Sequence, residues 1–398
     1  MTQLDPRLNP FREDLAAVSL QDRVRAQRYA APELRQVAAP AAPVRIAPRF
    51  DAPLATEALS GELVSVYEFR EGWAWGQLHE DGYVGYIPAD CLSAMIEENT
   101  HRVSARLTYL YPAPDMKQPP LTKLSFSCTV APIGKLDGRF AELSRGGFIF
   151  ADHLVGIRER ARDFVRVAER FVGVPYLWGG KTFLGIDCSG LVQISLQSAG
   201  VPCLRDSDMQ MRNAGEPLDP ANLEAIQRGD LLFWSGHVAI AQSPDWMIHA
   251  SGHHMEVVVE PIRRAVERTA ENHGPILAIV RPSMDAQMPA LVASMPAARQ
   301  HPPSHTGELG NAGVPHEPAQ LPSPPQSTAI PAGAQPVAPA GAGKGEAPIE
   351  AAAQFVAARI AASMLSRPKE QAGHNAETQQ DREPFQRLSG KPGPAGTG

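Results

Sequence analysis

Three residues in the second half of the chain have the side chains and the surroundings that covalent catalysis needs: Cys188, His237 and His249. Cys188 follows the turn GlyIleAsp and opens a stretch that predicts a helix to about Ala199. A thiol at a helix N-terminus meets the positive end of the dipole and unpaired amide groups, which predict a lowered thiol pKa. The amide of Cys188 could also stabilise the oxyanion of a tetrahedral intermediate. The pattern therefore predicts a cysteine nucleophile.

The two histidines lie on strands that are predicted to pair. His237 begins the segment HVAIAQ, where its ring can face the helix N-terminus and act as a general base. His249 follows twelve residues later, across the turn signal SerProAspTrp at 243–246. A hairpin at this turn brings residues 249–251 near residues 237–239, so we expect His249 to contact His237 and to fix its tautomer.

Less specific interpretations remain open at this stage. A cysteine is most often an inert buried thiol, and strand histidines are usually ordinary surface or core residues. The same three residues, with Asp187, could also hold a metal, but the spacing contains no paired CxxC or HxxxH. We therefore expect neither a metal nor an organic cofactor. The remaining cysteines lie in strand-like or loop contexts and are interpreted as structural: Cys91, Cys128 and Cys203.

The elements that must position the three residues are predicted within residues 157–285. Residues 157–172 have apolar side chains at helical spacing, and a turn rich in Gly and Pro leads from them to Cys188. Strands are then predicted in the order 230–234, 237–242, 247–251, 256–262 and 277–282. Helices followed by an antiparallel sheet indicate the α+β class.

Two smaller units precede this domain. Residues 1–43 are expected to form an N-terminal arm with a helix from Leu20 to Ala31. Short strands separated by turn signals are predicted within residues 44–96 and again within residues 101–156. This pattern is typical of a small β-barrel. The second unit repeats features of the first, including the final small-Asp-X-Leu, which indicates a weak internal duplication.

Composition sets the limits on function and compartment. Of the 398 residues, 38 are Pro and 33 are Gly, and residues 286–398 contain 17 of the prolines but only two aromatic residues. This segment is expected to be a disordered tail, with a possible helix over 349–366 and no partner that the sequence identifies. A net charge of −6 and a pI near 6.1 argue against nucleic acid as a partner. No apolar run is long enough for a transmembrane segment, and without a secretory signal pattern a cytoplasmic location is expected.

Six blocks of sequence resemble the NlpC-type cysteine peptidase family, in order and in spacing. They are ValProTyrLeuTrpGlyGly (174–180), AspCysSerGlyLeuValGln (187–193), LeuArgAspSer (204–207), GlnArgGlyAspLeuLeuPheTrp (227–234), GlyHisValAlaIle (236–240) and MetIleHisAlaSerGly (247–252). The resemblance implies a papain-like fold and a Cys188–His237–His249 triad. It implies that the hydroxyl of Tyr176 helps the oxyanion site, although Tyr176 could simply be an aromatic packed beside Trp178.

The barrels before this domain resemble those of the γ-D-glutamyl-L-diamino acid endopeptidases of that family. The resemblance implies that Tyr83 closes one end of the cleft and that Asp187 accepts the ammonium of a murein peptide with a free N-terminal L-Ala. Tyr83 could also be an ordinary barrel aromatic, and Asp187 a helix N-cap. Ser189 and Ser251 are the other expected substrate-binding residues.

The expected activity is hydrolysis of the γ-D-Glu–diamino acid bond by a cysteine-type endopeptidase, in recycling of murein peptides. Two alternatives stay open. One is a Cys–His amidase or acyltransferase acting on a substrate that is not a cell-wall component. The other is a cell-wall-peptide binding protein without catalysis.

Overall fold

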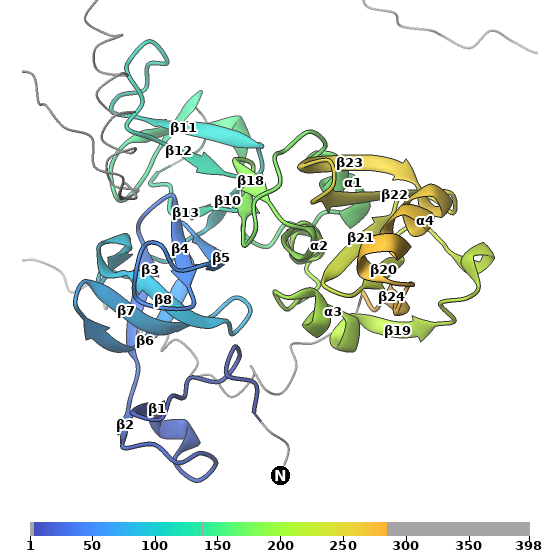
Figure 1. The fold of residues 1–398 in the computed structure, drawn as a ribbon. Helices are drawn as coiled ribbons and strands as arrows, with labels where there is room; N and C mark the ends of the chain where they lie inside the picture. Colours follow the sequence, from blue (N-terminus) through green and yellow to red (C-terminus); the bar gives the residue numbers. More distant parts are fainter. Residues whose placement is uncertain (1–3, 135, 137, 285–398) are drawn as a thin grey trace, which may run out of the picture. The chain divides into compact units, whose positions relative to one another are not determined.

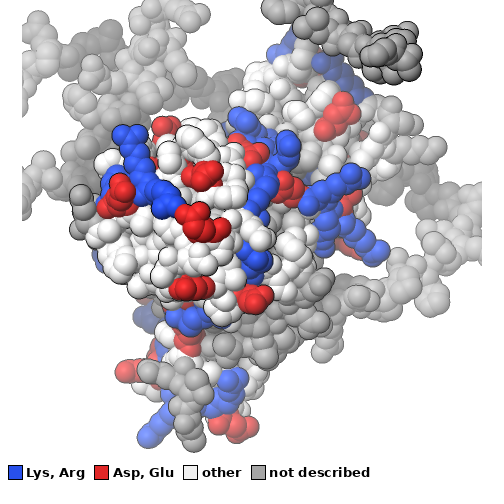
Figure 2. Space-filling view, turned by 90° about the vertical axis from the view of Figure 1, so that its right-hand side faces the viewer, with Lys and Arg blue, Asp and Glu red and all other residues white. Residues whose placement is uncertain are grey.

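The structure, a computed structural model, describes residues 4–134, 136 and 138–284. The predicted tail and its helix over 349–366 lie outside the described residues. Within the described part, no helix is long and apolar enough to cross a membrane. Figure 2 shows Lys and Arg side chains interspersed with Asp and Glu on the face in view.

The N-terminal segment contains no α-helix between residues 4 and 31, so the predicted helix from Leu20 to Ala31 is wrong. Strand β1 (Leu15–Ala17) pairs in parallel with β2 (Arg28–Ala30), and the 3₁₀ turn η1 (Val18–Leu20) follows β1 directly. Leu15 and Leu20 are buried in one cluster with Tyr67 and Trp75 of the following domain. Packing against these aromatic side chains therefore outweighs the local apolar spacing that suggested a helix.

The first barrel is a seven-stranded sheet in the order β5-β4-β8-β7-β6-β3-β9 (Figure 1). Its first strand begins at Glu33, so the sheet starts earlier than the predicted boundary at 44. The strands are β3 (Glu33–Val37), β4 (Ala41–Arg45), β5 (Leu54–Leu59), β6 (Leu63–Arg70), β7 (Trp73–Leu78), β8 (Val84–Pro88) and β9 (Leu92–Ser93), with the turn η2 (Ala89–Cys91) before β9.

Residues 101–156 form two smaller antiparallel sheets, ordered β13-β10-β16 and β12-β11-β15-β14. The strands are β10 (His101–Val103), β11 (Leu107–Tyr111), β12 (Thr122–Ser125), β13 (Thr129–Val130), β14 (Phe140–Glu142), β15 (Phe148–Phe150) and β16 (Leu154–Gly156), with η3 (Ala151–His153) before β16. Both copies of the repeated small-Asp-X-Leu motif form a 3₁₀ turn that leads into a short strand.

The C-terminal domain is built on an antiparallel sheet in the order β19-β24-β20-β21-β22-β23. The predicted α+β order of helix and strands is confirmed, but the helix predicted over 157–172 is only the short α1. Two helices, α3 and α4, were not predicted. The elements are α1 (Phe164–Glu169), β17 (Lys181–Thr182), β18 (Gly185–Ile186), α2 (Cys188–Ser198), α3 (Ser207–Asn213), β19 (Gly215–Leu218), η4 (Leu223–Ala225), β20 (Leu231–Trp234), β21 (His237–Ala241), β22 (Trp246–Ser251), β23 (Glu256–Pro261), α4 (Ile262–His273) and β24 (Ala278–Pro282).

Helices cover both faces of this sheet, because successive strand residues point to opposite sides. Phe233 and Ile240 belong to the core cluster that contains α1 and α2, whereas Trp234 and Ala241 belong to the cluster that contains Ala265 of α4. Figure 1 shows α2 beside β21 and α4 beside β22 and β23. A strand that is buried on both faces has a nearly continuous apolar sequence, as β20 (LLFW) and β21 (HVAIA) have.

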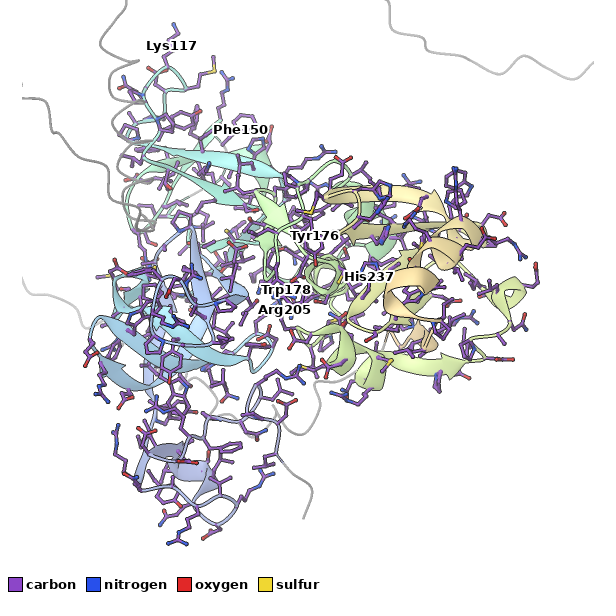
Figure 3. All side chains as sticks on the ribbon, viewed as in Figure 1. Lys117, Phe150, Tyr176, Trp178, Arg205 and His237 are labelled. Carbon is purple, nitrogen blue, oxygen red and sulfur yellow. The ribbon has the colours of Figure 1, made fainter. Side chains whose placement is uncertain are left out.

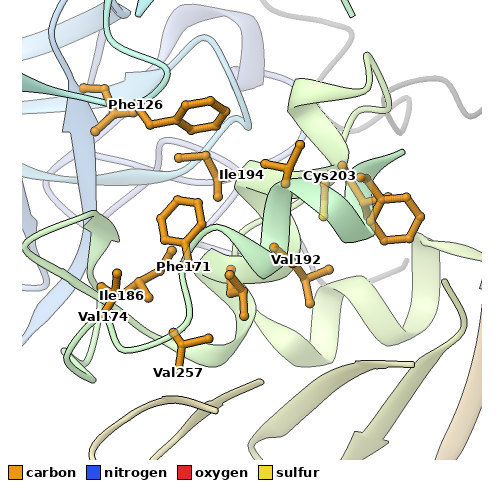
Figure 4. Close-up of a cluster of buried hydrophobic side chains, with 14 of the residues drawn as sticks. Phe126, Phe171, Val174, Ile186, Val192, Ile194, Cys203 and Val257 are labelled. Carbon is orange, nitrogen blue, oxygen red and sulfur yellow. The ribbon is translucent and has the colours of Figure 1, made fainter. Parts of the chain in front are cut away.

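The core of the C-terminal domain continues into residues 101–156 (Figure 4). Phe171 stacks on Phe183 with ring centroids 3.9 Å apart, and Phe126 packs edge-on against Phe171 at 6.1 Å. Truncating an aromatic side chain in such a core typically costs about 3–5 kcal/mol. This aromatic cluster therefore packs residues 101–156 against the residues between α1 and α2 of the C-terminal domain.

Candidate active site

Cys188 is the first residue of helix α2, as its sequence context predicted. The backbone N–H groups of Ser189 and Val238 donate toward its sulfur, which places the thiol against the start of β21. Cys188 is 5 % exposed and lines a cavity of about 480 Å³. The thiol is thus nearly enclosed by protein but open to this one cavity.

Gly190, the third residue of α2, permits a close contact that shapes the turn before the nucleophile. A Cβ atom at this position would lie 2.5 Å from the carbonyl oxygen of Gly180 and 3.0 Å from Oδ1 of Asp187. Both neighbours are fixed, one by the backbone and the other by capping the helix. Only glycine therefore fits at position 190 without moving the loop that carries Gly179 and Gly180.

The two predicted histidines contact each other. Register between β21 and β22 pairs Ile240 with Ile248, and this hairpin brings His237 Nε2 to 2.7 Å from His249 Nδ1. Both residues are buried, His237 at 8 % and His249 at 2 % exposure. The prediction that His249 reaches His237 is confirmed. His237 directly follows Ser235 and Gly236, which line the cavity with Cys188.

The predicted fall in the pKa of Cys188 is wrong in sign. Burial, and next the charge of Asp187, raise the pKa of the thiol to about 12, and the two backbone N–H groups and Arg205 offset only part of this. The helix N-terminus is therefore outweighed by desolvation. A thiolate at neutral pH therefore requires a group that accepts the proton from the sulfur.

Tyr176 is held beside the nucleophile by backbone pairing. It forms a bridge with Ile186, and its N–H donates to the carbonyl of Met255 at 2.8 Å. Burial, and next the charge of Cys188, raise the pKa of its phenol, so the hydroxyl stays protonated and can donate a hydrogen bond. Tyr176 and Trp178 both line the cavity, and Figure 3 shows them near α2 with Arg205 and His237.

Asp187 acts as the N-cap of α2, the second of its two predicted roles. Its carboxylate forms a bidentate ion pair with Arg205, which is 1 % exposed, at 2.7 and 2.9 Å. It also accepts hydrogen bonds from the N–H groups of Gly179 (2.8 Å) and Gly190 (2.7 Å) and from the hydroxyl of Ser189 (3.3 Å). A carboxylate offers about four lone-pair sites. The structure therefore does not support Asp187 as the receptor of a substrate ammonium.

Tyr83 reaches the same cavity from the first barrel. Its ring packs in the barrel core, and its hydroxyl donates to Oδ2 of Asp206 at 3.1 Å. Both of its predicted roles, barrel aromatic and cavity residue, are therefore compatible with the structure. Arg7 of the N-terminal segment donates to the same oxygen of Asp206 at 2.8 Å. Tyr83, Asp206 and Arg7 all line the cavity together with Cys188, so the barrel and the N-terminal segment form part of its wall.

The two predicted substrate-binding serines have different positions. Ser189 lines the cavity, and its hydroxyl accepts from Arg205 at 2.8 Å. Ser251 is 2 % exposed, its hydroxyl bonds Nδ1 of His254 at 3.0 Å, and it is not among the cavity residues. The structure therefore does not bring Ser251 to the cavity, because it ends β22 with its side chain turned into the following turn.

Three polar residues at the site were missed: Arg205, Asp206 and Glu260. Arg205 and Asp206 lie in the block LeuArgAspSer, whose residues the sequence pattern assigns to no role. Glu260, within the apolar strand EVVVEP, bonds His249 Nε2 at 2.7 Å. A charged residue in an otherwise buried strand is the signal that could have found it.

The other three cysteines do not share the site. Cys91, Cys128 and Cys203 are free thiols, and none of them is among the residues that line the cavity. Burial raises the pKa of Cys91 to about 11 and that of Cys128 to about 12. Over the ranges 4–134 and 138–284, no cluster of three or more His, Cys, Asp or Glu residues is suited to a metal ion.

A cysteine at the N-terminus of a helix and a hydrogen-bonded pair of histidines on an antiparallel sheet are residue types that cysteine hydrolases of the α+β class use. The NlpC/P60 family matches residues 173–270, and the bacterial dipeptidyl-peptidase Sh3 domain matches residues 44–92. The C-terminal domain is therefore similar to the NlpC/P60 family, and the first barrel is similar to the Sh3 domain of bacterial dipeptidyl-peptidases.

Similar proteins match different shares of the chain, and the chain spans only about a third of the length of dipeptidyl-peptidase 6. Dipeptidyl-peptidase 6 of Lysinibacillus sphaericus is 37 % identical over 101 residues, which is 25 % of this chain and 36 % of that protein. Gamma-D-glutamyl-L-lysine dipeptidyl-peptidase of Bacillus cereus is 29 % identical over 241 residues, 52 % of this chain and 71 % of that protein. The crystal structure of an NlpC/P60 family protein from Bacillus cereus has a TM-score of 0.53 at 22 % identity and covers 64 % of this chain and 100 % of that one. The last match shows a common fold.

Proposed function

We propose that the protein is a cysteine peptidase that hydrolyses the bond between γ-D-Glu and the diamino acid of murein peptides with a free N-terminal L-Ala. The observation that carries the proposal is the cavity, in which Cys188 lies with Tyr83 of the barrel and Asp206. The names of the similar proteins, dipeptidyl-peptidase 6 and gamma-D-glutamyl-L-lysine dipeptidyl-peptidase, support the class of substrate.

Asp206 is the residue best suited to receive the substrate ammonium. It occupies the N-cap position of α3, where an Asp side chain normally bonds the first turn, yet it forms no capping hydrogen bond. Its carboxylate is turned instead to Tyr83 and Arg7 at the cavity wall. Burial raises the pKa of Asp206, whereas the charges of Arg205 and Arg7 oppose this and favour the ionised form. A carboxylate and a phenol at one end of a cavity can accept hydrogen bonds from the ammonium group of a substrate. An acylated amine has no such charge and would need additional space there.

The reaction begins with proton transfer from the Cys188 thiol to His237, through the ring nitrogen that His249 does not use. The sulfur then attacks the γ-carbonyl carbon of D-Glu. The amide N–H of Cys188 and the phenol of Tyr176 stabilise the oxyanion. The C–N bond breaks as His237 gives its proton to the leaving amine. His237 next deprotonates a water molecule, which attacks the thioester, releases L-Ala-γ-D-Glu and restores the thiol.

Three finer features belong to the same proposal. The C-terminal domain has a papain-like arrangement of nucleophile helix and histidine strands, and residues 101–156 form a second SH3-like barrel. The enzyme acts on peptides released during wall turnover, in the cytoplasm, as a recycling activity. A requirement for a free amine suits small released peptides, because the stem peptides of an intact wall carry L-Ala in amide linkage.

The test compares L-Ala-γ-D-Glu-diaminopimelate with its N-acetylated form as substrates. The unsubstituted protein is expected to release the L-Ala-γ-D-Glu dipeptide from the free peptide and to cleave the acetylated peptide much more slowly. Cys188→Ala is expected to abolish cleavage. Equal cleavage of the two peptides would contradict the specificity, and activity in Cys188→Ala would contradict the nucleophile.

A further inference from the structure

The hydrogen-bonded chain at the active site does not end at His249. Its Nε2 atom lies 2.7 Å from Oε1 of Glu260, and its Nδ1 atom bonds His237. Arg268 of α4 donates to both carboxylate oxygens of Glu260, at 2.6 Å to Oε1 and in a still shorter contact to Oε2. The two histidines, Glu260 and Arg268 thus form one continuous polar series across three strands and helix α4.

Strand register explains how Glu260 comes to this place. In the β22–β23 pair, Met247 lies opposite Glu260 and His249 lies opposite Val258. Glu260 is therefore the diagonal neighbour of His249 on the same face of the sheet. Met247 packs in the cluster that includes α4, so this is the face that α4 covers and from which Arg268 reaches the carboxylate.

The protonation of Glu260 decides the direction of every hydrogen bond in the series. Although burial opposes ionisation, the hydrogen bonds from Arg268 and His249 outweigh it and lower the pKa of Glu260. An ionised carboxylate only accepts, so His249 must carry its proton on Nε2. The Nδ1 atom of neutral His249 is then an acceptor, and His237 must donate to it from Nε2.

We propose that Glu260 is a positioning residue: it fixes His249 as the Nε2-protonated tautomer and so leaves Nδ1 of His237 as the unprotonated nitrogen that takes the thiol proton. This inference rests on the proposed cysteine chemistry of the site. Without an acceptor at position 260, the proton of His249 can move to Nδ1. His237 would then carry its own proton on Nδ1 and could not act as a base toward Cys188.

The carboxylate also supplies charge to the ion pair. Burial, the dominant influence, lowers the pKa of His249, and Glu260 opposes this through its hydrogen bond and its charge. Arg268 and His254 act in the same direction as burial. At the thiol, the charge of Asp187 raises the pKa of Cys188 and the charge of Arg205 lowers it. Of these groups, Glu260 is the anion next to the histidines, so its loss disfavours imidazolium and raises the apparent pKa at which Cys188 is alkylated.

The experiment uses the full chain and three variants. Glu260→Met keeps the volume but removes both the acceptor and the charge. Glu260→Gln keeps an amide oxygen that can accept from His249 but removes the charge. Glu256→Gln is the matched control, because this residue is on the same strand, is exposed and lies opposite Ser251. Thermal unfolding of each variant establishes that it is folded.

Two readouts do not depend on any peptide substrate. The first is the tautomer of His237 and His249, measured by ¹⁵N NMR of histidine-labelled protein. The second is the rate of Cys188 alkylation by iodoacetamide as a function of pH. In the unsubstituted protein and in Glu256→Gln we expect His249 as the Nε2–H tautomer, and His237 with a proton on Nε2 whether or not its Nδ1 has taken the thiol proton. In Glu260→Met we expect loss of this tautomer and alkylation at pH 7 slowed by at least about tenfold. Glu260→Gln is expected to fall between.

An unchanged tautomer and an unchanged alkylation profile in folded Glu260→Met would overturn the proposal. Should that variant not fold, Glu260→Gln decides: severalfold slower alkylation supports the proposal, and a rate equal to that of Glu256→Gln overturns it. If the unsubstituted protein failed to cleave the murein peptide, the proposed function would be lost, but the NMR and alkylation results would still decide the role of Glu260.

Discussion

Replacing Asp206 by Asn tests the amine pocket, because it removes a negative charge while keeping the size of the side chain. In the free protein the side chain is 25 % exposed, and one oxygen accepts from both Tyr83 and Arg7. A hydrogen bond to a charged group is worth about 1.5–3 kcal/mol. At 1.4 kcal/mol for each factor of ten, the loss corresponds to about a 10- to 150-fold fall in kcat/KM. The larger values typical of fully buried charge pairs do not apply at this exposure.

The assay measures kcat/KM for L-Ala-γ-D-Glu-diaminopimelate and for its N-acetylated form. The fall in Asp206→Asn should be confined to the free peptide, so that discrimination between the two substrates moves toward unity. Asp208→Asn serves as the matched charge change, since Asp208 also pairs with Arg7 but is 41 % exposed. An exposed pair is worth about 0.2–1 kcal/mol, so a change of at most about fivefold is expected there. The reasoning is refuted if Asp206→Asn slows both substrates equally.

Three other substitutions probe the site. In His237→Ala the thiol loses its proton acceptor, and burial raises the thiol pKa to about 12. The rate of Cys188 alkylation by iodoacetamide should therefore keep rising with pH above pH 10. A rate that reaches a plateau near neutral pH would argue against the ion pair. Arg205→Leu leaves the buried Asp187 carboxylate unpaired and should lower the free energy of unfolding by about 3–5 kcal/mol in denaturant titrations, whereas Arg263→Leu, at an exposed pair, should change it by less than about 1 kcal/mol. Gly190→Ala places a methyl group 2.5 Å from the Gly180 carbonyl oxygen and should destabilise the fold by about 1–3 kcal/mol and reduce activity; Gly252→Ala, with no atom within 4 Å of the added carbon, should do neither.

The local elements of the C-terminal domain could be predicted because its sequence patterns are strong. The segments LLFW and HVAIA are continuous apolar runs bounded by Gly, Ser and Asp, and they form β20 and β21. The turn SerProAspTrp marks the hairpin, and the hairpin alone places His249 near His237. These predictions needed only neighbours in sequence.

The N-terminal segment could not be predicted in the same way. Leu15 and Leu20 have a spacing that suits a helix, but the structure buries them against Tyr67 and Trp75, which are about fifty residues away in sequence. Such distant packing partners leave no local signal. Helix α4 was not predicted either, because most of its side chains are polar. It is held on the sheet by Ile262 and Ala265, which pack with side chains of β22 and β24.

The polar contacts of the site were the least predictable part. Asp187 was expected to meet substrate, but a buried arginine eighteen residues later neutralises it. Asp206 and Tyr83 are separated by 123 positions, and Glu260 reaches His249 only through strand register. The direction of the Cys188 pKa shift depended on the degree of burial, which the sequence does not contain.

The most direct test of the central claim is to find the covalent intermediate. The unsubstituted protein would be mixed with L-Ala-γ-D-Glu-diaminopimelate, quenched in acid during turnover, digested and mapped by mass spectrometry. The account predicts an L-Ala-γ-D-Glu acyl group on the peptide that contains Cys188, formed as free diaminopimelate appears. Turnover without any adduct, or an adduct on Cys91, Cys128 or Cys203, would contradict it.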